Sequence, residues 1–485
     1  MKKLKTFAFY GILILFTIIS AIRPVHAEIR MPQIFSDNMV LQRDTEVTIW
    51  GWADPGERVR VRIDGQQKTT RADRQGNWRV ALEPVKAGGP HTLSIEGNNT
   101  IVYSNILFGE VWLCSGQSNM QWTVAQSANP EEEILNANYP EIRLFSVPRR
   151  LLPEPANDLD DGEWLVCSPE TVASFSAVGY YFGRHLHQEL DVPIGLVNSS
   201  WGGTNVETWT SLEMMQAHPD FAERMKEPAA AALARLENAP RPNDFPTLLF
   251  NGMIYPIVNY TIKGTIWYQG ESNSARAYQY RTLFPNLIQD WRNQWSMPEM
   301  PFLFVQLANF RAPDEQPVDN AWAELREAQT MTLTVPYTGM AVAIDIGEAG
   351  DIHPKNKQDV GLRLALNALK ISYGKDIVYS GPMYKSMQSE GNRIRVRFDS
   401  VGSGLKVNDK YGYLKAFAVA GNDRVFHWAQ AYLDGNDVVV YSDQVASPVA
   451  VRYAWGTNPD DANLYNVEGL PASPFRTDTW PGITE

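Results

Sequence analysis

The sequence has 485 residues, of which 44% are hydrophobic, and carries a formal net charge of −12. This negative charge argues against nucleic acid or an anionic membrane surface as a partner, because both attract basic proteins. Two cysteines are too few for a disulfide scaffold, and no Cys/His spacing matches a zinc site. Cys114 and Cys167 can form one bridge in an oxidising compartment or remain buried thiols.

Residues 1–27 have the pattern of a signal peptide. Three lysines precede the apolar run FAFYGILILFTIISAI, and VHA at positions 25–27 supplies a small-residue cleavage site. We therefore expect an exported protein, periplasmic or secreted, whose mature chain begins near Glu28 and has no integral membrane span after cleavage. A lone N-terminal anchor is the alternative, because the apolar run is near the lower limit for spanning a bilayer.

Three regions follow the predicted leader. Residues 28–105 alternate apolar and polar positions, as in EVTIWGW and RVRVRI, which predicts an N-terminal β-sandwich domain. Residues 106–375 alternate short apolar runs with helical stretches, the pattern of a parallel sheet covered on both faces. Residues 376–485 return to alternation in RIRVRF and DVVVYS, which predicts a C-terminal β-rich domain.

The central region yields specific elements. Its predicted strands are ILFGEVWLC, PIGLVNS, KGTIWY, PFLFVQLA and MAVAID, and its predicted helices are VGYYFGRHLHQEL, YRTLFPNLIQDWRNQW and KQDVGLRLALNALKI. A segment rich in Ala and Pro, residues 214–246, interrupts this order and is interpreted as a surface insertion.

Polar motifs follow the predicted core strands. They are GQSNM at 116–120, WGGT at 201–204, QGESN at 269–273 and DIHP at 351–354. An open α/β sheet binds ligands at the carboxyl ends of its strands, so these motifs are expected to converge on one edge. Tryptophans near the motifs suit the apolar faces of sugar rings.

Ser118 is the candidate nucleophile, with helix capping as its alternative role. A serine hydroxyl needs a neutral imidazole to accept its proton. Only His353 follows a predicted core strand at this edge, and a helix opened by Pro354 is expected to favour the neutral ring. The other histidines of the mature chain lie in the β regions, in the insertion or together on one helix: His91, His427, His218, His185 and His187.

Two further roles need residues. A carboxylate should orient the second imidazole nitrogen; Asp351 is nearest in sequence, and Asp345 or a backbone carbonyl is the alternative. An oxyanion needs fixed donors, for which the amides of Ser118 and Gly203 and the side chain of Gln269 are candidates. Together these residues predict hydrolysis of an ester.

The motifs resemble those of sialate O-acetylesterases and related SGNH carbohydrate acetylesterases. GEVWLCSGQSNM resembles the nucleophile block, WYQGESN the oxyanion-hole block and DIHPKNKQDVG the histidine block. LFNGMIYP, SSWGGT, MPQIFSDNMVLQRDTEVTIWG and RYAWGTNPDDANLYNVEGLPASPF extend the resemblance over most of the mature chain.

This resemblance implies an SGNH-hydrolase (flavodoxin-like) three-layer α/β catalytic domain that uses no metal and no cofactor. It implies an acetylated carbohydrate as substrate and an acetyl-enzyme intermediate. The residues that match are Ser118 and His353 for the dyad, Gly203 and Gln269 for the oxyanion hole, and Glu271, Asn273 and Asn251 as possible substrate contacts, the first two of which can instead order their loop.

The chain also departs from the family pattern. Many SGNH enzymes place aspartate three residues before histidine, where this chain has Gly350, and the usual third-block asparagine is replaced by QGESN. An α/β-hydrolase is disfavoured because Met120 stands where G-x-S-x-G requires glycine. A non-catalytic carbohydrate-binding protein is the rival from another class.

The sugar remains open between sialic acid and plant xylan or xyloglucan. A sialic acid carboxylate calls for an arginine, and Arg276, Arg311 and Arg326 are the candidates. Oligomeric state is not predicted.

Overall fold

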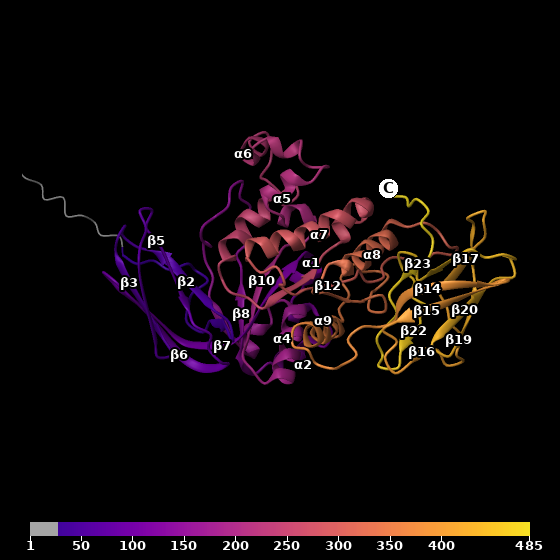
Figure 1. Ribbon diagram of the computed structural model, residues 1–485, viewed down its shortest axis with the longest axis horizontal. Coiled ribbons are helices and arrows are strands. Elements are labelled where there is room, and N and C mark those ends of the chain that lie inside the picture. Colours follow the sequence, from indigo (N-terminus) through magenta and orange to yellow (C-terminus); the bar gives the residue numbers. More distant parts are fainter. Residues whose placement is uncertain (1–27) are drawn as a thin grey trace, which may run out of the picture.

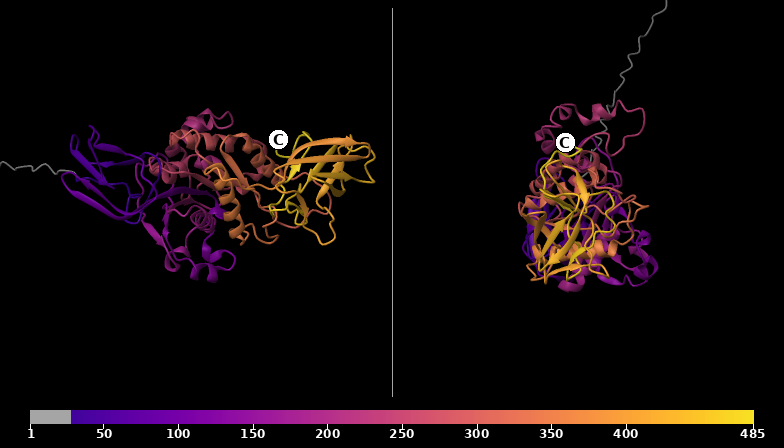
Figure 2. Two further views of the ribbon diagram at one scale, coloured as in Figure 1. Left: turned by 60° about the horizontal axis from the view of Figure 1, so that its bottom comes forward. Right: turned by 90° about the vertical axis from the view of Figure 1, so that its right-hand side faces the viewer.

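The computed structural model describes residues 28–485. An N-terminal β region, a central α/β region and a C-terminal β region follow one another along the long axis of the molecule (Figures 1 and 2). The predicted signal peptide lies outside the described residues. This arrangement confirms the predicted α/β class with β-rich additions at both ends.

The central sheet has the strand order β13-β12-β11-β7-β10-β8-β9, parallel except for β9. The chain leaves β7 for strands on one side and later returns to β11 on the other side. Such a reversal creates a crevice at the carboxyl ends of the strands. The strands are β7 (Thr100–Gly116), β8 (Tyr139–Ser146), β9 (Trp164–Cys167), β10 (Ile194–Ser200), β11 (Gly264–Tyr268), β12 (Phe302–Val305) and β13 (Thr338–Ala341).

Helices cover both faces of this sheet. Helices α4 and α9 pack against each other on one face, and α7 and α8 lie together on the other (Figure 1). The predicted insertion, residues 214–246, includes most of α5 and all of α6, and α6 projects from the body (Figure 1). The helices are α1 (Ser118–Gln121), α2 (Pro130–Leu135), α3 (Pro169–Val172), α4 (Ala177–Leu190), α5 (Leu212–Ala217), α6 (Ala229–Leu233), α7 (Ala277–Gln294), α8 (Ala321–Met331) and α9 (Lys357–Ile371).

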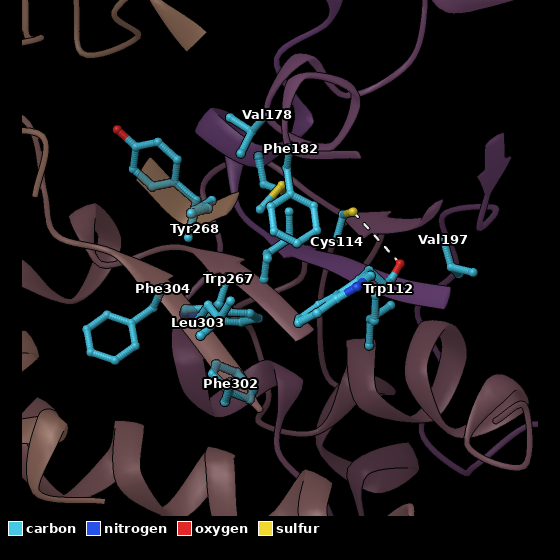
Figure 3. Close-up of a cluster of buried hydrophobic side chains, with 14 of the residues drawn as sticks. Trp112, Cys114, Val178, Phe182, Val197, Trp267, Tyr268, Phe302, Leu303 and Phe304 are labelled. Atoms are coloured by element: carbon cyan, nitrogen blue, oxygen red, sulfur yellow. Dashed lines mark hydrogen bonds between the residues drawn. The ribbon is translucent and has the colours of Figure 1, made fainter. Parts of the chain in front are cut away.

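Large apolar side chains fill the space between the sheet and its helices (Figure 3). Trp112, Trp267 and Phe302 are almost fully buried, and burying such rings is the main driving force for packing these layers. Cys114 lies in the same core, and both cysteines are buried free thiols. The alternative without a disulfide therefore holds.

Strand β7 joins the N-terminal β region to the central sheet. Its first half pairs with β6 and β1, and its second half pairs with β10 and β11. The predicted boundary at residue 105 therefore falls inside one continuous strand. The N-terminal strands are β1 (Val40–Gln42), β2 (Val47–Trp52), β3 (Arg58–Ile63), β4 (Gln66–Arg71), β5 (Asn77–Leu82) and β6 (Gly88–Glu96).

The C-terminal β region is tied to the central region by Arg326 of α8, which donates to the carbonyl oxygens of Gly456 and Thr457. Within residues 28–485, no helix is long and apolar enough to cross a membrane. The C-terminal strands are β14 (Met383–Glu390), β15 (Arg393–Asp399), β16 (Leu405–Val407), β17 (Phe417–Ala420), β18 (Phe426–Trp428), β19 (Gln430–Asp434), β20 (Asp437–Tyr441), β21 (Ala450–Tyr453), β22 (Leu464–Asn466) and β23 (Phe475–Arg476).

Candidate active site

The backbone places Ser118 at the end of β7. Gly116 has φ +137°, and a Cβ there would lie 2.2 Å from the Tyr268 carbonyl oxygen of β11. The next amide, that of Gln117, donates to the same oxygen over 2.9 Å. Only glycine allows this approach and this backbone angle, so the chain turns sharply and presents Ser118 at the sheet edge.

Ser118 begins the single turn of α1, and Gln117 is its N-cap residue. The serine hydroxyl is therefore not the capping group. Its Oγ lies 2.9 Å from Nε2 of His353. Gly202, after β10, packs so closely that a Cβ on it would lie 3.1 Å from Cβ of Ser118. Three of the predicted strand-end motifs thus meet at one point.

His353 is oriented by Asp351. Nδ1 of the ring lies 3.1 Å from Oδ1 of Asp351, and the His353 amide donates to the same oxygen over 2.9 Å. Because an ionised carboxylate only accepts, Nδ1 is the donor to Asp351, and in a neutral ring Nε2 is then the acceptor for the Ser118 hydroxyl hydrogen. The backbone hydrogen bond from His353 lowers the pKa of Asp351, which keeps it ionised.

Trp122 holds the imidazole from its face. The indole and imidazole centroids are 4.7 Å apart and their planes differ by 11°. Trp122 is four residues after Ser118, the spacing that places two side chains on one side of a helical turn. The stacking role of Trp122 was not predicted, and this spacing from Ser118 is the signal in the sequence that indicates it.

Asp345, the alternative partner for His353, is paired with Arg363 instead. Its two carboxylate oxygens accept from Arg363 over 2.6 and 2.8 Å, so it does not orient His353.

The prediction that Pro354 opens a helix is wrong. Helix α9 begins at Lys357, and the Asn356 side chain caps it by accepting from the Asp359 amide. The segment between His353 and the helix is instead held by the Lys355 amide, which donates to Glu348. The dipole of α9 therefore does not act directly on His353, because such effects fade beyond the first turn.

The three oxyanion candidates differ in whether their N–H groups are free. The backbone amides of Ser118 and Gly203 have no hydrogen-bond partner among residues 28–485. The Gln269 amide nitrogen donates to Thr204 O and Asn273 Oδ1, over 3.0 and 2.7 Å, and the side chain is fully buried. Both of its N–H groups are occupied, which corrects the expectation that Gln269 offers a donor to substrate.

Of the other candidates for substrate contact, Asn273 and Asn251 are buried and Glu271 is partly buried. Asn273 accepts from the Val206 amide and donates to Glu207, which joins two loops. Glu271 accepts from Asn119 over 2.6 Å. Asn251 donates to the Leu152 carbonyl oxygen and is 2% exposed. Hydrogen bonds within the protein hold these side chains, which order the loops around the site.

The candidate arginines differ in whether their guanidinium groups already have partners in the protein. Arg326 donates to backbone carbonyls, among them Leu307 O and Ala308 O, and Arg276 pairs with Glu207. Arg311 makes no ion pair within the described chain, and its amide donates to Ala349 O, two residues before Asp351.

Arg149 was not predicted. Its guanidinium lies 5.7 Å from the ring centroid of Trp201, the residue before Gly202, and it makes no ion pair within residues 28–485. No pattern around Arg149 indicated this placement, because its segment lies far from the strand-end motifs in sequence.

Within residues 28–485, no group of three or more His, Cys, Asp and Glu side chains could hold a metal ion.

Comparison with known proteins identifies the family. A model for carbohydrate esterases described as sialic acid-specific acetylesterases matches residues 108–370. Sialate O-acetylesterase of mouse is 34% identical over 92% of this chain and 94% of its own, and that of human is 32% identical over 97% of both. A carbohydrate acetylesterase from Xanthomonas citri is 42% identical, with a TM-score of 0.86, over 93% of this chain and 100% of that chain. The chain therefore belongs to the sialic acid-specific carbohydrate acetylesterase family of carboxylic ester hydrolases.

Proposed function

We propose that this protein is an exported esterase that removes O-acetyl groups from carbohydrates, with Ser118 as nucleophile and His353 as general base. The observation that carries the proposal is the 2.9 Å contact between Ser118 Oγ and His353 Nε2 at the switch point of the sheet. Nucleophile and base within hydrogen-bond reach are the signature of an activated serine, and family membership supplies the ester as substrate.

The reaction runs in two halves. His353 Nε2 takes the hydroxyl proton as Ser118 Oγ attacks the acetyl carbonyl carbon, and the carbonyl oxygen becomes an oxyanion. The imidazolium then returns the proton to the departing sugar oxygen, which leaves an acetyl ester on Ser118. A water molecule, deprotonated by His353, attacks that ester; the bond from the acetyl carbon to Ser118 Oγ then breaks, the imidazolium returns the proton to Oγ, and acetate leaves.

Asp351 stabilises the imidazolium formed in each half. Because its side chain is 43% exposed, water screens this interaction. The oxyanion is assigned to the free amides of Ser118 and Gly203, since amides fixed in place before reaction stabilise developing charge without reorganisation.

Sialic acid is the proposed sugar. Support comes from the names of the mouse and human relatives and from Arg149 and Arg311, two open guanidiniums on segments adjacent to the dyad. A carboxylate on the substrate can pair with either guanidinium. Acetylated xylan or xyloglucan is the alternative, because the Xanthomonas citri relative is described only as a carbohydrate acetylesterase.

Export and domain organisation are proposed on the sequence pattern. The leader 1–27 is expected to be removed, and residues 28–105, 106–375 and 376–485 are expected to serve as accessory β, catalytic and C-terminal β domains. Sequencing the N-terminus of the protein recovered outside the cytoplasm should give Glu28 as the first residue; a retained Met1 would contradict export by cleavage.

Acetate release by the wild type and Ser118→Ala, from O-acetylated sialic acid and from acetylated xylan, tests the activity. We expect release from the sialic acid that disappears in the variant. Arg149→Ala and Arg311→Ala should raise KM for that substrate alone, with Arg150→Ala, whose guanidinium pairs with exposed Asp160, as the matched control. Release from xylan only would assign the alternative sugar, and equal release by Ser118→Ala would refute the nucleophile.

A further inference from the structure

Asn119, which follows the nucleophile, lies between two charged side chains: the fully buried Lys357 and the partly buried Glu271. Nζ of Lys357 donates to its Oδ1 over 2.5 Å, and its Nδ2 donates to Oε1 of Glu271 over 2.6 Å. Lys357 has no exposed surface and Asn119 is 1% exposed. The amide thus turns its oxygen to the Lys357 amine, which donates, and its nitrogen to the Glu271 carboxyl group, which accepts, so these two partners fix which way it points.

The same amide reaches the backbone of the histidine segment. Asn119 Nδ2 also donates to the carbonyl oxygen of Ile352 over 3.1 Å. Asn119 is bonded to Ser118 and Ile352 is bonded to His353, so this hydrogen bond joins the two segments one residue away from each member of the dyad. It is a direct, partly buried side-chain link between them.

Lys357 also faces the aromatic side chains of the site. Its Nζ lies 6.0 Å from the ring of Trp122, which stacks on His353, and 5.4 Å from the ring of Tyr268. A cation within about 6 Å of a ring face is attracted by the ring. The charged groups around this amine are carboxylates: Glu271, Asp351 and Glu348.

The position of Lys357 is unfavourable for a lysine on two counts. It is the first residue of α9, where the helix dipole disfavours a cation, and it is fully buried. Burial lowers its pKa to about 7 and raises the pKa of Glu271, whose Oε2 has no partner within the described chain. Apolar side chains would usually stabilise such a site as well or better, so these groups call for a role beyond packing.

We propose that Lys357 and Glu271 are positioning residues that lock the Asn119 amide, and that this amide fixes the distance between Ser118 and His353. The proposal rests on the catalytic roles proposed above for those two residues. A displacement of about 1 Å in a catalytic group can lower turnover about 100-fold, which makes such a lock consequential.

The test measures kcat and KM for acetate release, together with Tm, in the full-length mature protein. Asn119→Ala should lower kcat by about 100-fold and Lys357→Met by about 10-fold, both with KM within about twofold of the wild type. Lys370→Met is the matched control, because this lysine lies on the same helix and pairs with the exposed Asp376. It should retain full activity.

Two combinations separate positioning from general damage. In the Asn119→Ala background, Lys357→Met should lower kcat by less than about threefold, because its route to the dyad is already lost. Glu271→Gln keeps an acceptor for Asn119 and removes the uncompensated charge, so Lys357→Met/Glu271→Gln should recover most of the kcat lost in Lys357→Met. The comparison of Lys357→Met with Lys357→Met/Glu271→Gln tests the positioning role even if Asn119→Ala does not fold.

Contrary results are distinct from failure of the proposed activity. The positioning role would be overturned if Asn119→Ala and Lys357→Met lowered kcat independently, so that their losses multiplied in the double variant. It would also be overturned if the variants changed only KM and Tm. In either case an inactive Ser118→Ala would still support the esterase mechanism. An active Ser118→Ala would overturn both.

Discussion

The two sides of the dyad are built differently. The Ser118 side is held by backbone: Gly116 lies against Tyr268, the Gln117 amide bonds to the same carbonyl, and Gly202 packs on the nucleophile. The His353 side is an irregular segment held by side chains, namely the stacked Trp122, the half-exposed Asp351 and the Asn119 amide described above.

The fold itself positions Ser118, whereas local side-chain contacts position His353. A nucleophile at the end of a central strand cannot move without disturbing the sheet. A base on a segment outside the sheet can be displaced by changing one neighbour, so its position is adjustable and vulnerable. Substitutions on the two sides should therefore fail in different ways: loss of folding on the serine side and loss of turnover alone on the histidine side.

His353→Ala gives the largest expected change in turnover. We expect kcat to fall by about 10⁴-fold or more, because Ser118 then has no base, while Tm changes little, because the side chain is partly exposed and lies outside the sheet. Steady-state acetate release and thermal unfolding measure the two quantities. A large drop in Tm would mean that the histidine segment also supports the fold.

Gly116→Ala should damage the fold. The added Cβ would meet backbone atoms of Tyr268 that cannot swing away, so we expect the free energy of unfolding to fall by several kcal/mol. Gly203→Ala is the matched control, because it shares a positive φ but its Cβ would meet nothing within 4 Å; its expected loss is about 1–2 kcal/mol. Denaturant titration compares them, and equal losses would argue against backbone placement of the nucleophile.

Asp351→Asn should lower kcat by about 10- to 100-fold, less than loss of the base. The asparagine Oδ1 can still accept from Nδ1, but the negative charge that stabilises the imidazolium is lost, and water already screens that charge in the wild type. Asp345→Asn, which disturbs the contacts of Asp345 with Arg363 and Tyr465 but none with His353, should leave kcat unchanged. A loss as deep as that of His353→Ala would show that Asp351 is essential rather than supporting.

The smallest expected effect concerns the two buried thiols, Cys114 and Cys167, which should not react in the native protein. Burial raises the pKa of Cys167 to about 12 and that of Cys114 further, so both remain protonated thiols at pH 8, where a free thiol begins to ionise. An alkylating reagent at pH 8 should modify neither cysteine in the native protein and both in denaturant, as read by intact mass. Rapid native labelling would show that the core opens.

The sequence predicted the site residues that directly follow a strand. It did not predict which hydrogen-bond partners the buried polar side chains would have. Periodicity located β7, α4 and α9, and reading the strand ends brought Ser118 and His353 together. It missed β8, whose centre carries Arg143; that guanidinium is buried and donates to the carbonyl oxygens of Pro140 and Asn38, contacts that no periodicity reports.

The direction of a buried amide is equally invisible in a linear pattern. Gln269 was expected to face substrate, but its carboxamide serves Thr204 and Asn273. Lys357 was one letter in a predicted helix, although its amine lies against Asn119. Both outcomes depend on partners from distant segments, which only the folded chain brings together.

The most direct test of the central claim is to trap the nucleophile. A fluorophosphonate reacts with an activated serine, and peptide mapping by mass spectrometry locates the adduct. We predict one adduct, on Ser118, formed at the rate at which acetate release is lost, and no adduct in His353→Ala on that timescale. An adduct on another residue, or continued acetate release by protein fully modified at Ser118, would contradict the account.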